Sequence, residues 1–211
     1  MIRSALHVYG DGLERRHELL LRQIDGTAIP LALARWLGPP DRTDESVIRR
    51  ARGPVLDVGC GPGRHLHALA RRGVYGLGVD LSPVAVALAR DRGAIAVVGS
   101  IFDEIPGAGT WRTALLLDGN IGIGGDPVRL LQRVRALLHR GGEMLVELDP
   151  SDAGTKTVTV RLEADGEASG WFSWARVAIG DLDAIARLAG LRVAARWRRD
   201  ERWFARLHMS K

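Results

Sequence analysis

The sequence predicts an α/β fold: a Rossmann-like, mostly parallel sheet of seven strands with helices on both faces. From residue 55 onward, short apolar runs alternate with helical segments, and repeated strand–helix units of this kind imply parallel strands. Three of the runs carry an acid at or next to their carboxyl end, namely Asp57, Asp80 and Asp118. With 211 residues, 46% of them hydrophobic, the chain can form one sizeable core.

The first 53 residues are predicted to be a helical extension of the domain that spans residues 54–211. Hydrophobic residues recur close to the helical period in residues 13–24, and a second apolar stretch runs from Thr27 to Leu37. A third, short helix is expected around residues 44–51. Helices of this kind can pack simply against an edge of the sheet.

The strand and helix boundaries follow from capping residues and glycines. Ser82 and Pro83 are an N-cap and a first-turn proline, and Asp126 and Pro127 begin the next helix in the same way. The last two strands form an antiparallel pair. The predicted strands begin at residues 55, 73, 94, 112, 143, 191 and 202.

A β-hairpin is predicted as an insertion after the fifth strand, over residues 156–178. Residues 156–163 and 171–178 alternate between apolar and polar side chains, and Asp165-Gly166 lies between them. Alternation on both sides of a turn signal is typical of paired antiparallel strands. Such an insertion can reach the mouth of a site at the carboxyl ends of the strands.

The composition excludes several classes of protein. No apolar run approaches the roughly 18 residues of a membrane span, and the N-terminal residues lack the apolar core of a signal peptide. Cys60 is the single cysteine, so no internal disulfide can form. We therefore expect a cytoplasmic protein without a membrane partner.

The formal net charge of +5 raises the question of a nucleic-acid partner. All but two of the 30 basic residues are arginines, and five of these lie between Arg196 and Arg206 together with Trp197, Trp203 and Phe204. Basic residues with interleaved aromatics can bind RNA. They also fit two edge strands with solvated arginines and buried aromatics, which is the interpretation we favour.

Residues 55–65, Val-Leu-Asp-Val-Gly-Cys-Gly-Pro-Gly-Arg-His, predict a ligand-binding loop between a buried strand and a helix. Glycine permits positive φ and lets a ligand approach the backbone, and the following helix offers free N–H groups. The spacing is Gly-x-Gly-x-Gly, whereas dinucleotide sites need Gly-x-Gly-x-x-Gly, and no phosphate-loop lysine follows. A nicotinamide oxidoreductase is therefore disfavoured.

This loop resembles the first motif of the class I methyltransferases that depend on S-adenosylmethionine, and Gly-Val-Asp-Leu-Ser-Pro at residues 78–83 resembles their second motif. The likeness covers roughly residues 55–150 and extends by topology to residue 211. It implies S-adenosylmethionine as cofactor, S-adenosylhomocysteine as product, and a small metabolite or natural product as methyl acceptor. In this family, N-terminal helices often form a lid over the substrate.

The resemblance also implies the cofactor site. Asp80 would accept hydrogen bonds from the ribose hydroxyls, although it could instead cap the next helix. Leu81 would lie against the adenine ring, and Ser100 stands where many relatives have an acid. Asp118 would border the sulfonium. The expected cofactor-binding residues are Asp57, Gly59, Cys60, Gly61, Gly63, Asp80, Leu81, Ser100, Ile101 and Asp118.

Tyr9 and Asn120 are the candidates on the substrate side. Residues 118–121 read Asp-Gly-Asn-Ile, where enzymes that methylate amide or exocyclic base nitrogens carry an Asn-Pro-Pro-Tyr-like string, which argues against those acceptors. Asp118, Glu147 and Asp149 could imitate the carboxylate set of a magnesium-dependent enzyme, but the other motifs of such enzymes are missing and no metal is expected.

Two other functions stay open from the sequence. One is an RNA methyltransferase that uses the basic C-terminal hairpin, and the other is a module that binds cofactor or a partner without catalysis. The acceptor atom, any general base and the oligomeric state are not determined by the sequence.

Overall fold

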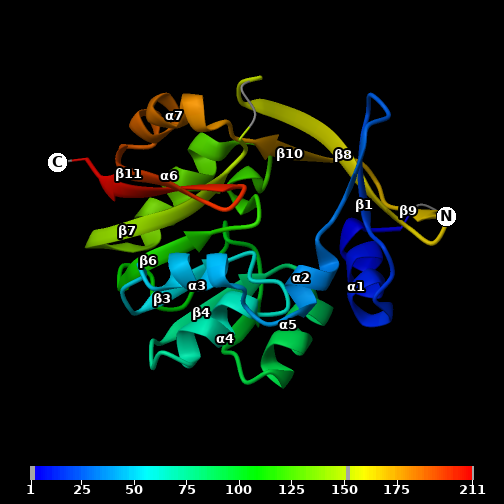
Figure 1. Cartoon of the computed structure of the whole chain (residues 1–211), viewed down its shortest axis with the longest axis horizontal. Coiled ribbons are helices and arrows are strands. Elements are labelled where there is room, and N and C mark those ends of the chain that lie inside the picture. The colour runs from blue at the N-terminus through cyan, green and yellow to red at the C-terminus, as the bar shows by residue number, and fades with distance from the viewer. Residues whose placement is uncertain (1–2, 151–152, 211) are drawn as a thin grey trace.

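Seven strands form the main sheet of the computed structural model, which describes residues 3–150 and 153–210 (Figure 1). They are β3 (Val55–Val58), β4 (Gly76–Asp80), β5 (Ala96–Val98), β6 (Trp111–Leu116), β7 (Leu138–Leu148), β11 (Leu191–Arg199) and β12 (Arg202–Met209). Their order is β11-β12-β7-β6-β3-β4-β5, and every neighbouring pair is parallel except those of β12. The predicted seven-stranded, mostly parallel sheet is confirmed.

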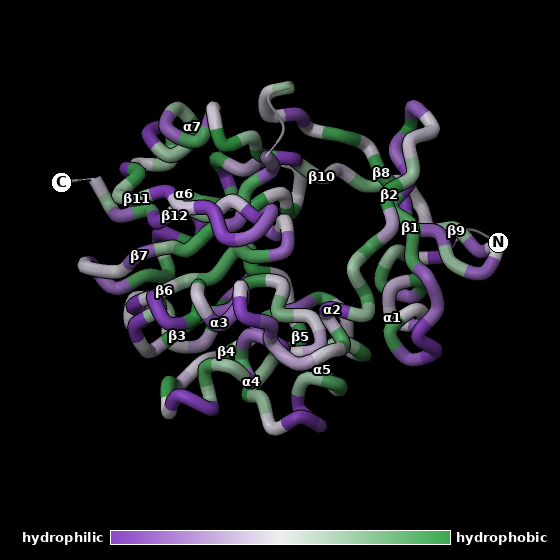
Figure 2. The backbone as a smooth tube through the Cα atoms, in the orientation of Figure 1, coloured by the Kyte–Doolittle hydropathy of each residue, from purple (hydrophilic) through white to green (hydrophobic). Residues whose placement is uncertain are grey.

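Helices cover both faces of this sheet because successive strand residues point to opposite faces. Ala114, Leu116 and Val146 belong to a core with α6 (Pro127–Leu137) and α7 (Leu182–Leu188). Leu115 and Leu145 belong to the opposite core, with α3 (Arg42–Ile48), α4 (Arg64–Ala70) and α5 (Pro83–Asp91) (Figure 1). Figure 2 shows hydrophobic central strands and a hydrophilic turn between β11 and β12.

A second sheet, here called the cap sheet, joins the segment that precedes the main sheet to the insertion between β7 and α7. It contains β1 (Leu20–Gln23), β2 (Ala28–Pro30), β8 (Lys156–Ala164), β9 (Glu167–Ala168) and β10 (Phe172–Arg176). β8 and β10 pair antiparallel, so the predicted hairpin insertion is confirmed. β1 lies on the other side of β8, with Leu21 opposite Leu162.

The helical pattern predicted over residues 13–24 is wrong, and the N-terminal segment contains two strands beside its helices. The first helix, α1 (Ala5–Arg15), ends where Arg16 adopts a left-handed conformation, and residues 20–23 are a strand rather than the end of a helix. A second helix, α2 (Leu33–Leu37), follows β2. Local periodicity could not identify β1, because its partner β8 lies far away in the sequence.

A third core holds α1 against α5 and the cap sheet, through Val8, Leu13, Leu19, Ala85 and Leu162 among others. The helix approaches its neighbours closely because it carries glycines on its packed side: a Cβ on Gly12 would lie 2.6 Å from Leu19 Cγ. None of the helices in the described part of the chain is both long and apolar enough to cross a membrane.

We predict that Gly12→Ala destabilises the protein by about 1–3 kcal/mol, because the added methyl overlaps Leu19. Alanine is the better helix former by about 1 kcal/mol, so a loss of stability can come only from this overlap. Gly180→Ala is the control, since a Cβ there meets nothing within 4 Å. Urea unfolding measures both variants, and equal or higher stability of Gly12→Ala would refute the tight packing of α1.

Candidate functional site

A cavity of about 620 Å³ lies between the carboxyl ends of the parallel strands and the cap sheet. Parallel sheets place ligand sites at this edge, because the loops that follow the strands converge there. One side is formed by residues that follow the strands: Val58, Gly59, Cys60, Gly61, Val79, Asp80, Leu81, Gly99, Ser100, Ile101, Asp118 and Asn120. The other side comes from α1, α2 and the cap sheet: Ala5, Leu6, Tyr9, Leu21, Leu31, Trp36, Leu162, Phe172, Ser173 and Trp174.

Asp57 and Gly63 are the two sequence-predicted site residues that do not line the cavity. Asp57 is buried below the loop, and its Oδ2 has no hydrogen-bond partner among the described residues. Gly63 begins α4 with φ of 81°, and a Cβ there would lie 2.9 Å from the Cβ of Ala89. Gly63 therefore serves helix packing rather than ligand contact.

Asn120 is hydrogen-bonded to the beginning of the glycine loop. Gly59 and Gly61 have φ of 68° and 52°, which other residues rarely adopt. The amide nitrogen of Asn120 donates to the carbonyl oxygens of Val58 at 2.9 Å and of Gly59 at 2.8 Å. Asn120 therefore orders the loop while it lines the cavity, and its role toward a substrate stays a prediction.

Asp80 connects the end of β4 to the glycine loop. Its Oδ2 accepts from the Gly61 N–H at 2.9 Å, and its Oδ1 accepts from the Ser82 N–H at 2.8 Å. The α5 N-cap itself is Ser82, whose side chain accepts from Ala85 N–H. Burial and the nearby Asp57 raise the pKa of Asp80 above its ordinary value, while the two backbone hydrogen bonds lower it. Each carboxylate oxygen keeps lone pairs for a ligand hydroxyl.

Tyr9 reaches the glycine loop from α1. Its hydroxyl oxygen lies 3.3 Å from the position that a Cβ on Gly61 would take, and its ring makes an edge contact with Trp36, with 6.3 Å between centroids. Burial raises the pKa of Tyr9 well above 10, and the charges of Asp80 and Asp118 raise it further, so the hydroxyl stays protonated. The α1 helix thus covers the loop.

Asp118 is the centre of a set of buried charges that the sequence did not reveal. Its carboxylate accepts from Arg35 Nη2 at 2.7 Å, Arg64 Nη2 at 2.5 Å and Arg202 Nη2 at 3.3 Å. Burial would raise the pKa of Asp118, but His65 and the three arginines together lower it below its ordinary value. The backbone of Asp118 is in the left-handed region, with φ of 55°.

Arg202 on β12 extends this set to β7 and α3. It donates to both oxygens of Glu147, at 2.8 and 2.7 Å, and to Asp44 Oδ1 at 2.8 Å. Asp44 also contacts Arg64, the residue that follows the glycine loop. We call Arg35, Asp44, Arg64, Asp118, Glu147 and Arg202 the charge network. Asp118 and Glu147 were singled out from the sequence, Arg64 stands next to the glycines, and Arg202 belongs to the C-terminal arginine cluster, whereas Arg35 and Asp44 carried no sequence signal of a site.

His65 lies inside the same region and lines the cavity. It is 4% exposed, and its Nε2 has no hydrogen-bond partner among the described residues. The carboxylates of Asp44, Asp57 and Asp118 lie 3.7, 3.8 and 3.9 Å from its ring nitrogens. This polar, partly unsatisfied end of the cavity suits a charged part of a ligand.

The carboxylates that could have imitated a magnesium site are paired with arginines. Glu147 binds Arg202, and Asp118 binds three arginines of the charge network. Asp149 Oδ2 accepts from Arg176 Nε at 2.6 Å. These oxygens are thus engaged by cations of the chain itself.

Most of the C-terminal arginines are paired as well. Arg196 binds Asp183, Arg198 binds Glu201 at 2.5 Å and Arg206 lies 3.4 Å from Glu143. Their aromatic neighbours are packed inward: Phe204 is fully buried and stacks on Trp197, with 5.8 Å between ring centroids. This arrangement favours the interpretation of the hairpin as a pair of edge strands rather than as an RNA-binding surface.

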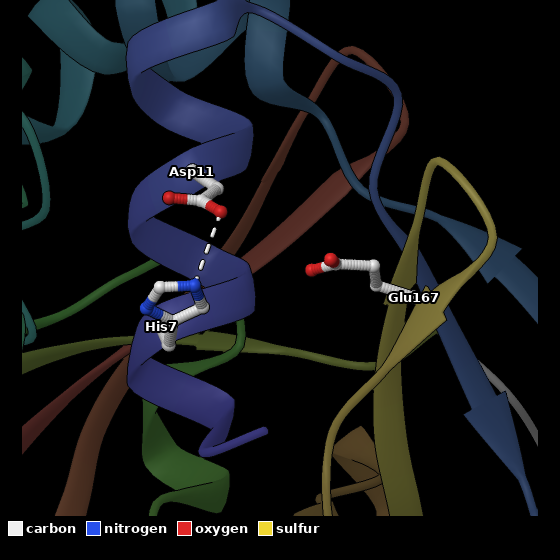
Figure 3. Close-up of side chains that lie close together, drawn as sticks. All are labelled: His7, Asp11 and Glu167. Carbon is white, nitrogen blue, oxygen red and sulfur yellow. Dashed lines mark ion pairs between the residues drawn. The ribbon is translucent and has the colours of Figure 1, made fainter. Parts of the chain in front are cut away.

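A cluster of His7, Asp11 and Glu167 lies where α1 meets β9, away from the cavity (Figure 3). His7 Nε2 is 3.2 Å from Asp11 Oδ2. The guanidinium of Arg3 contacts His7, and its Nε is 3.0 Å from Glu167 Oε2. An arginine already supplies positive charge to this cluster, so we interpret it as an exposed tie between α1 and the cap sheet.

The part of the chain that contains the glycine loop is similar to a known protein family. Residues 55–142 match the family model of a methyltransferase domain. The match confirms the predicted resemblance to class I methyltransferases and the prediction of an enzyme of that kind.

Solved structures agree in fold. An S-adenosylmethionine-dependent methyltransferase from Bacteroides fragilis, in complex with S-adenosylhomocysteine, is 22% identical with a TM-score of 0.81, and the match covers 98% of this chain and 94% of that one. The CcbJ methyltransferase from Streptomyces caelestis is 19% identical, with a TM-score of 0.63 over 83% of this chain and 92% of that one. The 1,6-didemethyltoxoflavin-N1-methyltransferase of Burkholderia thailandensis, with bound 1,6-didemethyltoxoflavin and S-adenosylhomocysteine, is 19% identical, with a TM-score of 0.60 over 81% of this chain and 78% of that one.

We predict that Asp118 contributes to stability above its ordinary pKa of 3.8 and that this contribution is lost as the pH falls through its lower folded-state pKa. Asp118→Asn should therefore lose less stability between pH 5 and pH 2.5 than the parent protein, by roughly 1 kcal/mol. Urea unfolding at both pH values measures the difference. Asp91→Asn, at an exposed carboxylate, is the control, and an identical pH dependence in parent and Asp118→Asn would contradict the assignment.

Proposed function

We propose that this chain, which carries a class I methyltransferase domain, transfers the methyl group of S-adenosylmethionine to a small-molecule acceptor in the cavity described above, and releases S-adenosylhomocysteine. One observation carries the proposal: a single cavity is lined on one side by the glycine loop and Asp80 and on the other by the apolar cap sheet. Cofactor and acceptor can therefore share one cavity.

The residues on the strand side fit the cofactor. Asp80 keeps lone pairs toward the cavity and can accept from the ribose hydroxyls. Leu81 and Ile101 provide apolar surface for the adenine ring. The Oγ of Ser100 accepts from the Phe102 N–H at 3.1 Å, and its own hydroxyl proton remains available to the adenine.

The amino-acid part of the cofactor fits the end of the cavity next to the charge network. An ammonium and a carboxylate group both need partners when they leave water. Arg64 and His65 offer donors, and Asp118 offers an acceptor, directly beside the glycine loop. Positive φ at Gly59 and Gly61 keeps the loop backbone free of side chains, so a ligand can lie against it.

The sulfonium cofactor supplies an activated methyl group, so the chain has to place the acceptor in line with it and exclude water. The cap sheet, α1 and α2 close the cavity over the strand ends, which provides both conditions. The protonated Tyr9 hydroxyl faces the glycine loop and can donate a hydrogen bond within the cavity. A hydroxyl acceptor would also need a base, whereas a thiol or amine would need one much less.

An RNA methyltransferase is the second candidate, and the structure gives it less support. The basic C-terminal hairpin pairs most of its arginines internally, and Trp197 and Phe204 stack inside the fold. None of the described residues of that hairpin lines the cavity. We further propose a cytoplasmic location, which fits the buried thiol of Cys60.

We predict that substitutions at Gly61 and at Asp80 both reduce the affinity for S-adenosylmethionine, to different extents. Gly61→Arg should abolish S-adenosylmethionine binding, because the side chain enters the cavity beside Tyr9 at a backbone φ of 52°. Asp80→Ala should weaken binding by about 1–3 kcal/mol through lost hydrogen bonds to a charged acceptor. Isothermal titration calorimetry measures both, with Asp103→Ala, an exposed carboxylate, as the control. Unchanged affinity in the first two variants would overturn the site.

We predict that the purified protein moves labelled methyl groups from S-adenosylmethionine into low-molecular-weight compounds of a metabolite extract from the source cells. The Gly61→Arg variant should transfer none. Purified cellular RNA is the parallel acceptor. Label in RNA, with none in the small-molecule fraction, would favour the RNA candidate. Tight cofactor binding without transfer to either would indicate a non-catalytic binding module.

A further inference from the structure

We propose that the acceptor is an uncharged molecule with a flat, apolar ring system, and that the inner face of the cap sheet recognises it. This inference rests on the proposed function, because it assigns the cap-sheet side of the same cavity to the acceptor.

The strand register places one apolar set of side chains toward the cavity. Leu21 is opposite Leu162, and Phe172 is opposite Val160, two residues from Leu162 on the same strand. Side chains two residues apart share a face, so these residues and Trp174 lie on one side of the sheet. Leu21, Leu162, Phe172 and Trp174 all line the cavity.

Arg22, Arg161 and Glu163 of these strands lie on the opposite face and are paired there. Arg22 is opposite Arg161, and both donate to Glu163, at 2.7 and 2.8 Å. Lys156 and Arg176 share the apolar face by register, but neither lines the cavity, and Arg176 is paired with Asp149. Among the described residues that line the cavity, the charged and titratable groups are Tyr9, Cys60, Arg64, His65, Asp80 and Asp118, none of them on the cap sheet. An ammonium or carboxylate held against this sheet would be buried without a partner, at a cost of several kcal/mol.

The charge network strengthens this selection for a neutral acceptor. Asp118 already binds Arg35, Arg64 and Arg202, and Arg64 also contacts Asp44. The charges of the network at the strand ends are thus paired with one another within the protein. The unsatisfied His65 Nε2 beside them can bind the charged amino-acid part of the cofactor. On the cap-sheet side, none of the described lining residues offers a counterion to an acceptor of either sign.

Two aromatic pairs face the cavity and indicate a flat ring. Phe172 and Trp174 pack edge to face on β10, with 6.4 Å between ring centroids. Tyr9 and Trp36 form a similar pair, at 6.3 Å, on the α1 and α2 side. A planar ring can stack on or meet the edges of such side chains, a geometry worth roughly 0.5–1.5 kcal/mol per aromatic pair beyond the buried area.

The test compares three probes that share one ring system and differ in charge: 2-naphthol, 2-naphthoate and 2-naphthylmethylammonium. Each is titrated by calorimetry at neutral pH into the full-length protein saturated with S-adenosylhomocysteine. We expect 2-naphthol to bind at least about tenfold more tightly than either charged probe. Equal or tighter binding of a charged probe, or no saturable binding of 2-naphthol, overturns the inference.

Variants locate the binding surface. Phe172→Ala and Trp174→Ala should weaken 2-naphthol binding at least about tenfold and leave the affinity for S-adenosylhomocysteine within about twofold. Trp171→Ala is the matched control, because Trp171 is 46% exposed, is absent from the cavity lining and packs on Arg161. An equal effect of Trp171→Ala contradicts the assignment to the inner face. Failure of the parent protein to bind S-adenosylhomocysteine instead overturns the proposed function itself.

Discussion

The antiparallel pairing of β1 with β8 is the contact on which the shape of the site depends. It joins residues near the N-terminus to a hairpin inserted between β7 and α7, and so makes one sheet from two distant segments. Leu21 and Leu162 meet across this pairing, and both line the cavity. Without it, the strand ends of the main sheet would face solvent, and no apolar wall would stand opposite the glycine loop.

The charge network fixes the other side of the cavity. Taking ionised side chains out of water is expensive, and the cost is repaid only where each charge is paired and hydrogen-bonded. Asp118, Arg64 and Arg202 meet this condition through contacts that connect α2, α3, α4, the strands β7 and β12, and the loop that follows β6. Because the charges are mutually matched, they stiffen the strand ends and leave little attraction for a charged acceptor.

The cavity is thereby divided between two tasks. Backbone groups of the glycine loop, the Asp80 carboxylate and the neighbouring polar side chains suit a nucleoside with a charged tail. The cap sheet suits an apolar acceptor. Tyr9 and Trp36 come from the N-terminal segment and lie between these two regions, so α1 and α2 take part in both. The cap sheet covers the strand ends opposite the glycine loop, an arrangement that would help to exclude water in the proposed methyl transfer.

The sequence by itself determined the main sheet and the strand-side half of the site. Apolar runs followed by glycines and acids locate β3, β4 and β6, and the loop and Asp80 lie where these patterns predicted, because glycine conformation and helix capping are local properties. Gly63 and Asp57, which the motif also predicted for the site, do not line the cavity: Gly63 packs against Ala89, and Asp57 is buried.

Only the tertiary structure decided the cap sheet and the charge network. Residues 20–23 looked helical because the partner of β1 lies more than a hundred residues away, and strand pairing at that distance leaves no periodic signal. The partners Arg35, Asp44 and Arg202 likewise come from separate elements, and an ion pair becomes visible only when the fold brings its members together. The strand-side residues are thus encoded in local motifs, whereas the acceptor wall and the charges behind it depend on contacts between distant segments.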